Sequence, residues 1–227
     1  RGLDQHGHGT EVASLIAGRT VGVAKNATIY SVRVLDGNNF GTFSNFIAGV
    51  DYVFRQAIKP AIANMSFGQL AGEDMKLARA LETSVSSLIA SGITCVAAAP
   101  NLKIDAAQES PGRLADCLTV GVSNSTTDER GGGFGAGIDV FAPGEGLVCV
   151  AVTADDLPPN PSMLTTITGG TSTAAALVTG VAAMFLEKNP SATPAQVMEA
   201  IKTNATKDVL KNIPAGTKNR LLYSSFI

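Results

Sequence analysis

Three polar residues of the chain could together perform acyl transfer, and they occur in the order base, amide donor and nucleophile. Ser172 carries a hydroxyl group at the start of a series of small and apolar residues, which is typical of the first turn of a helix. His8 opens a second series of small residues, and Asn101 follows an apolar stretch that ends at residue 99. A histidine can activate a serine hydroxyl, and an asparagine amide can donate a hydrogen bond to an oxyanion. The sequence therefore predicts catalytic roles for His8, Ser172 and Asn101.

Each of these residues also has an ordinary structural interpretation. A lone histidine is most often a loop residue, a serine before a helix is a common N-cap, and asparagine is common in turns. For Ser172 the two interpretations are compatible, because a helix N-terminus offers N–H groups and a positive dipole end to an oxyanion. His6 is the only other histidine, and no motif surrounds it. His8 is thus the base that the sequence offers to Ser172.

The residues around these three positions resemble the subtilisin-like serine proteases, most closely the proteinase K branch. The resemblance extends from Gly7 to the C-terminus and rests on motifs in the family's order and spacing. These motifs are residues 7–13, 21–27, 31–36, 64–68, 96–101, 139–144 and 170–172. The resemblance implies a serine endopeptidase in which His8 activates Ser172 and Asn101 donates to the oxyanion.

The resemblance also implies where a polypeptide substrate binds. The family holds an extended peptide between two strands, as an addition of β-structure. By matching residues, Gly41 would lie on one side of this peptide and Ser66, Phe67 and Gly68 on the other. The wall of the primary side-chain pocket would be formed by Ala98, Ala99 and Pro100.

A structural calcium ion is implied in the same way, although the chemistry itself needs no cofactor. Asp139 matches the family's carboxylate ligand, and carbonyl groups near Ala115 and Cys117 match the others. Calcium takes six to eight oxygen ligands, so one matched carboxylate is equally well explained as an ordinary aspartate near the start of a strand.

The chain departs from the family pattern around the predicted catalytic helices. Pro100 replaces a glycine, which removes an N–H group and fixes φ near about −65°. Elsewhere the family's usual His, Met, Pro and His are replaced by Glu11, Thr173, Ala176 and Leu177. These changes leave open an alternative, a catalytically impaired relative that binds a peptide or protein without cleaving it. A lipase-like hydrolase is excluded, because Gly-x-Ser-x-Gly is absent around Ser172 and the histidine precedes the serine.

The family's catalytic aspartate has no counterpart in the sequence. It belongs to a central strand a few tens of residues before the histidine, whereas seven residues precede His8 here. Asp4 is too close along the chain to reach the far ring nitrogen from a neighbouring strand. A parallel sheet without a central strand exposes unpaired backbone groups. We therefore expect an N-terminally incomplete domain, and a separate N-terminal segment that completes both the sheet and the triad.

Apolar periodicity predicts alternating strands and helices. The expected strands are residues 28–34, 61–65, 93–99, 118–122 and 138–141. The expected helices are residues 43–56, 73–90 and 173–188, with a last helix that begins at 193–196. This alternation predicts one α/β domain over residues 1–227, doubly wound, with a mostly parallel sheet, helices on both faces and one central strand absent. The catalytic site should then lie at the carboxyl ends of the strands.

Composition narrows the class of protein further. The net charge of −2 and the absence of a basic cluster argue against nucleic-acid binding, and no uninterrupted apolar stretch is long enough for a membrane span. We interpret the three cysteines, Cys95, Cys117 and Cys149, as small buried residues rather than reactive thiols. Four Asn-x-Ser/Thr sequons slightly favour a secreted protein, with a vacuolar or lysosome-like compartment as the alternative.

Overall fold

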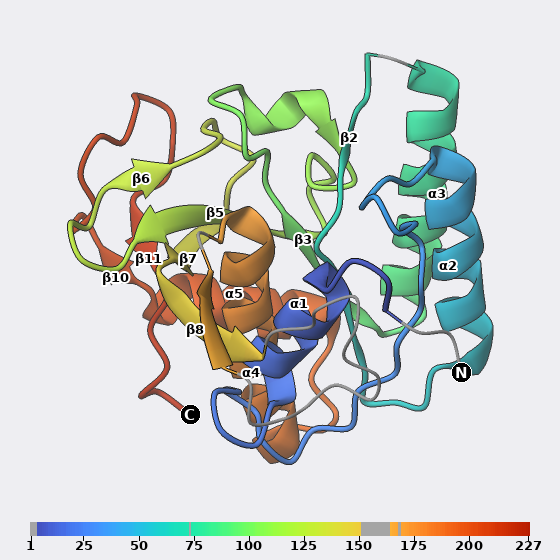
Figure 1. Cartoon of the computed structure of the whole chain (residues 1–227), viewed down its shortest axis with the longest axis horizontal. Helices are drawn as coiled ribbons and strands as arrows, with labels where there is room; N and C mark the ends of the chain where they lie inside the picture. The colour runs from blue at the N-terminus through green and yellow to red at the C-terminus, as the bar shows by residue number, and fades with distance from the viewer. Residues whose placement is uncertain (1–3, 73, 151–163, 168) are drawn as a thin grey trace.

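The computed structural model describes residues 4–72, 74–150, 164–167 and 169–227, and a mostly parallel sheet lies at its centre (Figure 1). The strand order is β1-β3-β5-β7-β11-β10, with β6 paired to β5. The strands are β1 (Ile62–Met65), β3 (Thr94–Ala98), β5 (Leu118–Asn124), β6 (Arg130–Gly131), β7 (Val140–Glu145), β10 (Thr206–Lys207) and β11 (Arg220–Leu221). The four neighbouring pairs from β1 to β11 are parallel, whereas β6 and β10 pair antiparallel with their neighbours.

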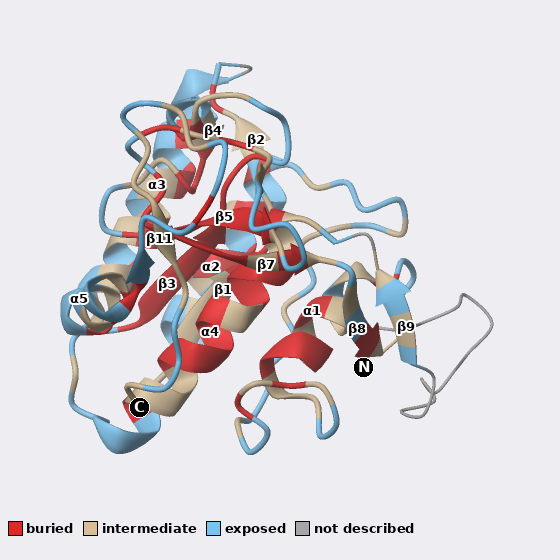
Figure 2. Cartoon of the chain, turned by 90° about the vertical axis from the view of Figure 1, so that its left-hand side faces the viewer, coloured by how far each residue is buried: buried red, intermediate tan, exposed pale blue. Residues whose placement is uncertain are grey.

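Helices cover both faces of this sheet, as the sequence predicts. They are α1 (His8–Ala17), α2 (Phe43–Gln56), α3 (Met75–Ala90), α4 (Thr171–Lys188) and α5 (Pro194–Asn204). Strand β3 is buried along its whole length, and its side chains alternate between two apolar clusters. Val96 and Ala98 pack with α4 and α5, whereas Cys95 and Ala97 pack with α2 and α3. Figure 2 shows this buried sheet between the two helical layers.

Two small antiparallel sheets lie outside the central one. Strand β2 (Gln69–Leu70) pairs with β4 (Glu109–Ser110), which follows the short 3-10 helix η1 (Ala106–Gln108), and β8 (Leu147–Val150) pairs with β9 (Leu164–Ile167). The β2–β4 pair ties the segment after β1 to the loop that follows Asn101. No described helix is long and apolar enough to cross a membrane.

The prediction of a strand at residues 28–34 is wrong. The structure gives this segment no strand, because no neighbouring strand in the described chain hydrogen-bonds to it. Instead, Val34 packs against Gly49 of α2, where an added Cβ would collide with the valine side chain. Strand β1 occupies the end of the sheet and pairs only with β3 among the described strands.

The three cysteines occupy buried positions and form no disulfide. Burial raises the pKa of Cys95 to about 12 and the pKa of Cys149 to about 11, with Glu11 contributing to the second shift. Thiols with such raised pKa values carry no thiolate near neutral pH. The interpretation of these residues as small buried groups is therefore confirmed.

Candidate active site

Ser172 lies in the first turn of α4, where hydrogen bonds hold the chain in a sharp turn. The hydroxyl of Thr173 accepts a hydrogen bond from the amide of Gly170 at 3.1 Å and lies 2.8 Å from the carbonyl oxygen of Gly144. Gly170 is required here because a Cβ at this position would collide with the side-chain oxygen of Asn101. The turn therefore places the N-terminal N–H groups of α4 beside Asn101.

The hydrogen bonds of Asn101 fix the orientation of its amide. Its Oδ1 accepts from the backbone N–H of Thr171 at 2.9 Å and from the hydroxyl of Thr171 at 3.0 Å. Because a backbone N–H group can only donate, the oxygen must be the atom that faces Thr171. The Nδ2 group then points away from Thr171, where it can donate to another acceptor.

His8 is the first residue of α1, and Asp4 holds this end of the helix together. The Asp4 carboxylate accepts from the amides of Gly7 at 2.8 Å and Thr10 at 2.9 Å, and from the Thr10 hydroxyl at 2.7 Å. Within the described chain no hydrogen bond joins Asp4 to the His8 ring. Asp4 thus satisfies the free N–H groups of the helix start and does not orient the imidazole.

Burial is the main cause that lowers the pKa of His8. The nearby His6 lowers it further, and Asp4 opposes the shift. A histidine with a lowered pKa is neutral near pH 7, which is the form that can accept a proton.

We expect the His8 ring in this chain to titrate below its ordinary pKa of 6.5. An NMR titration of the imidazole resonances measures this midpoint without any need for activity. His6→Ala should raise the midpoint, because it removes the like charge that disfavours the protonated ring. A midpoint above 6.5, or one that is unchanged in His6→Ala, would contradict the prediction that burial and His6 lower the pKa of His8.

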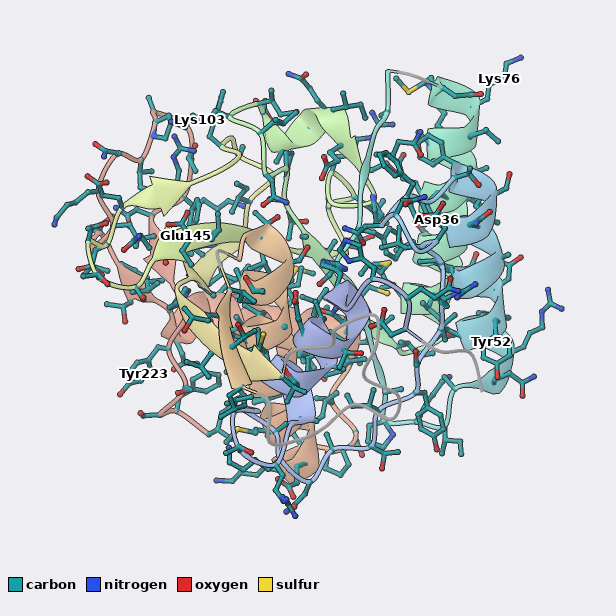
Figure 3. The ribbon with its side chains drawn as sticks, viewed as in Figure 1. Asp36, Tyr52, Lys76, Lys103, Glu145 and Tyr223 are labelled. Atoms are coloured by element: carbon teal, nitrogen blue, oxygen red, sulfur yellow. The ribbon has the colours of Figure 1, made fainter. Side chains whose placement is uncertain are left out.

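A cavity of about 450 Å³ brings most of the predicted site residues together. His8, Asn101 and Ser172 line it. The same cavity is also lined by six residues predicted to bind substrate, namely Gly41, Ser66, Phe67, Gly68, Ala98 and Ala99. The loop that presents Gly41 is held by Asp36, labelled in Figure 3, whose carboxylate accepts from the amides of Asn38 and Phe40.

The hydroxyl of Ser172 contacts Ser66, in the segment predicted to bind substrate, rather than the histidine. Its Oγ lies 3.4 Å from the carbonyl oxygen of Ser66, and the Ser66 hydroxyl donates to the Ser172 carbonyl at 2.9 Å. Among the described residues no hydrogen bond joins Ser172 Oγ to the His8 ring. Catalytic hydrogen bonds are often long or misaligned without substrate and tighten in the complex.

Two predicted site residues do not join this cavity. Pro100 is buried but is not among the lining residues, because its ring packs against Gly133 and its carbonyl accepts from the Gly133 amide at 2.8 Å. Asp139 is also buried and lies elsewhere in the structure. The expected contribution of Pro100 to the pocket wall therefore stays a prediction, beside Ala99 and Asn101, which do line the cavity.

Asp139, the residue expected to bind calcium, has two protein partners in the described structure. Its carboxylate accepts from the amide of Thr119 at 3.1 Å and forms an ion pair with Lys218 at 3.4 Å. The lysine thus already supplies a positive charge at this carboxylate. No cluster of three metal-binding side chains occurs among the described residues.

Sequence reasoning missed Thr171 and Glu109, which also line the cavity. Thr171 precedes the predicted nucleophile, so its position was a usable signal. Glu109 enters through the pairing of β4 with β2, and no local pattern in the sequence indicates this pairing.

Comparison with known families decides the class of the chain. The Peptidase_S8 model, which describes the subtilase family, matches residues 2–221. The chain belongs to the subtilase family. A solved crystal structure of a cold adapted subtilisin-like serine proteinase superposes with a TM-score of 0.87 and 38% identity, over 97% of this chain and 76% of the other. The expected subtilisin-like α/β fold is therefore confirmed.

Two curated subtilase relatives support the same assignment. The chain is 42% identical over 225 residues to an extracellular serine proteinase of Thermus sp. (strain Rt41A), covering 98% of this chain and 52% of the relative. It is 40% identical over 223 residues to alkaline serine exoprotease A of Vibrio alginolyticus, covering 97% of this chain and 39% of the relative. The chain thus spans about half or less of the length of these relatives.

Proposed function

We propose that this subtilase chain forms the catalytic part of a serine endopeptidase. The observation that carries the proposal is that His8, Asn101 and Ser172 line one cavity at the start of α4. This cavity supplies a nucleophile, a neutral base and an amide donor, which are the parts that acyl transfer requires.

In this mechanism the Ser172 Oγ attacks the carbonyl carbon of the scissile peptide bond while His8 accepts the hydroxyl proton. The oxyanion that forms receives hydrogen bonds from Asn101 Nδ2 and from the N-terminal N–H groups of α4. The C–N bond then breaks, and His8 gives its proton to the leaving amine. Water, activated by the same imidazole, hydrolyses the acyl-enzyme and restores the serine hydroxyl.

We further propose that the substrate lies as an extended peptide between Gly41 and the segment Ser66–Gly68. Both sides line the cavity that contains Ser172. A Cβ at Gly41 would collide with the ring of Phe46 and the carbonyl oxygen of Val34, so a glycine is required at this point of the cavity lining. Main-chain pairing of this kind holds many different peptides, while side-chain pockets select among them.

A strand from a segment outside these 227 residues completes the sheet in our proposal. Two features of the described chain support it: β1 has a free edge, and residues 28–34 have no neighbouring strand. The side chains of Met65 in β1 and of Val34 pack in the same apolar cluster, so the two segments lie near each other. We propose that this strand also carries the carboxylate that orients His8.

Secretion is the localisation that we propose, because one of the relatives is named an extracellular serine proteinase. The alternative function is a peptide- or protein-binding module without catalysis. A specific observation favours it: within the described chain His8 has neither a carboxylate partner nor a hydrogen bond to Ser172.

Covalent labelling tests the proposed chemistry directly. A fluorophosphonate probe should modify Ser172, and His8→Ala should abolish the modification because the hydroxyl loses its base. Ser224→Ala, which removes an exposed hydroxyl, is the control and should be labelled like the parent protein. Equal labelling with and without His8 would remove His8 as the base, and no labelling of the complete protein would favour the binding module.

A further inference from the structure

The cavity contains a second ionisable side chain that the proposed mechanism does not use. Among its described lining residues only His8 and Glu109 can ionise near neutral pH. Glu109 begins β4, which pairs with β2 so that Leu70 lies opposite Glu109. Its carboxyl group packs directly on the Cα of Gly68, where a Cβ would collide with Glu109 Oε1. The carboxyl group therefore lies against the substrate-binding segment itself.

No positive charge neutralises this carboxyl group in the described structure. The amide of Arg113 donates to the backbone carbonyl of Glu109 at 2.9 Å, but its guanidinium pairs with Glu82 at 2.5 Å. Lys103 is exposed and projects from the outside of the molecule (Figure 3). No hydrogen bond or ion pair to the Glu109 carboxyl occurs among the described residues.

The surroundings of Glu109 would favour binding of a cation beside its carboxyl group. Burial alone raises the pKa of Glu109 to about 7. A half-buried carboxylate without a counter-charge is costly, and a cation brought beside it would remove that cost. The nearby walls are formed by the small residues Gly68, Ala98 and Ala99, which leave room for a long side chain.

We propose that Glu109 is a specificity-determining residue that selects a lysine or arginine side chain in the primary pocket of the substrate site. This inference rests on the proposed peptidase function. The methylene groups of such a side chain can lie along the apolar wall while its charged end reaches the carboxylate. A charge-assisted hydrogen bond then forms in a partly water-excluded site.

The same geometry makes the preference depend on pH. Above about pH 7 Glu109 is ionised and attracts a cation, whereas below this pH its neutral form accepts uncharged side chains more readily. Titration of His8 affects every substrate alike, so it cancels from a ratio of two substrates. Of the other charged groups near β4, Arg113 is paired with Glu82, and the Asp105 carboxylate accepts from the Ala107 amide at 2.8 Å.

Matched peptides that differ only before the scissile bond test this inference. We expect the ratio of kcat/KM for lysine over leucine to rise with pH through about 7. Glu109→Gln should lower that ratio by about 10- to 100-fold, as expected for the loss of a hydrogen bond between two charged groups. Hydrolysis of the leucine peptide should persist. Glu187→Gln, which removes an exposed acid, should leave the ratio unchanged.

A binding measurement separates this inference from the proposed function. Benzamidine, a small cation, should bind Ser172→Ala about tenfold more tightly than it binds the Ser172→Ala/Glu109→Gln variant. Glu109→Ala serves as a second variant, and cooperative thermal unfolding verifies that each variant folds. If Glu109→Gln is active and keeps the same lysine preference, the role of Glu109 is overturned but the proposed peptidase function is not. Equal benzamidine binding with and without Glu109 would overturn it even if the protein cleaves no peptide.

Discussion

Replacing Ser172, His8 or both by alanine is expected to lower peptide hydrolysis by one and the same factor of about 2 × 10⁶. That magnitude is the one measured on subtilisin, another member of this family. The physical reason is that the two side chains act in a single step. The serine proton must move to the imidazole as the new C–O bond forms. Loss of either residue therefore abolishes the same step, and loss of the second lowers the rate no further.

Steady-state and single-turnover kinetics on an extended peptide measure these losses in the complete protein. Ser224→Ala, which removes an exposed hydroxyl, is the control and should retain the parent rate. The residual rate of the alanine variants should depend on Asn101, because the oxyanion donors act without the nucleophile pair. Losses that multiply in the double variant would mean that Ser172 and His8 act in separate steps.

The helices and most strands could be predicted from the sequence because their signals are local. The apolar spacing over residues 43–56 coincides with α2, and the continuously apolar stretch around Val96 forms the buried strand β3. Helix α3 begins two residues later than predicted, since the Asp74 side chain caps it by accepting from the amides of Lys76 and Leu77. Such a capping contact shifts a boundary without changing the element.

The error at residues 28–34 has a different origin. A β-branched sequence shows that a segment can become a strand, but only a hydrogen-bonded neighbour makes it one. Within the described chain this segment has no such neighbour, and Val34 packs beside α2 instead.

In the candidate site, too, the residues in local motifs could be predicted, whereas those placed by long-range contacts could not. Motifs around His8, Asn101 and Ser172 predicted three residues that the fold brings to one cavity. Position in a motif could not show that the Pro100 ring turns towards Gly133. Nor could it show that Glu109, which follows Asn101 in the sequence, returns to the cavity through β-pairing.

A strand added at the free edge of β1 is expected to have two separable effects. Pairing with β1 should stabilise the chain, because it satisfies backbone groups that the edge strand leaves unpaired. A carboxylate on that strand should raise turnover by about 3 × 10⁴, the factor that the aspartate contributes in subtilisin. The carboxylate orients the imidazole and stabilises its protonated form. Turnover should therefore rise more with the carboxylate than with strand pairing alone.

Co-expression of these 227 residues with the proposed strand-forming segment separates the two effects. The intact segment should raise the melting temperature and the rate, whereas its Asp→Asn variant should raise only the melting temperature. The carboxylate should also raise the His8 midpoint in the NMR titration, since an opposite charge favours the protonated ring. A stabilised complex in which neither the His8 midpoint nor the rate responds to the carboxylate would favour the binding module. Full activity of the 227 residues alone would show that His8 needs no added carboxylate, because Asp4 remains committed to the start of α1.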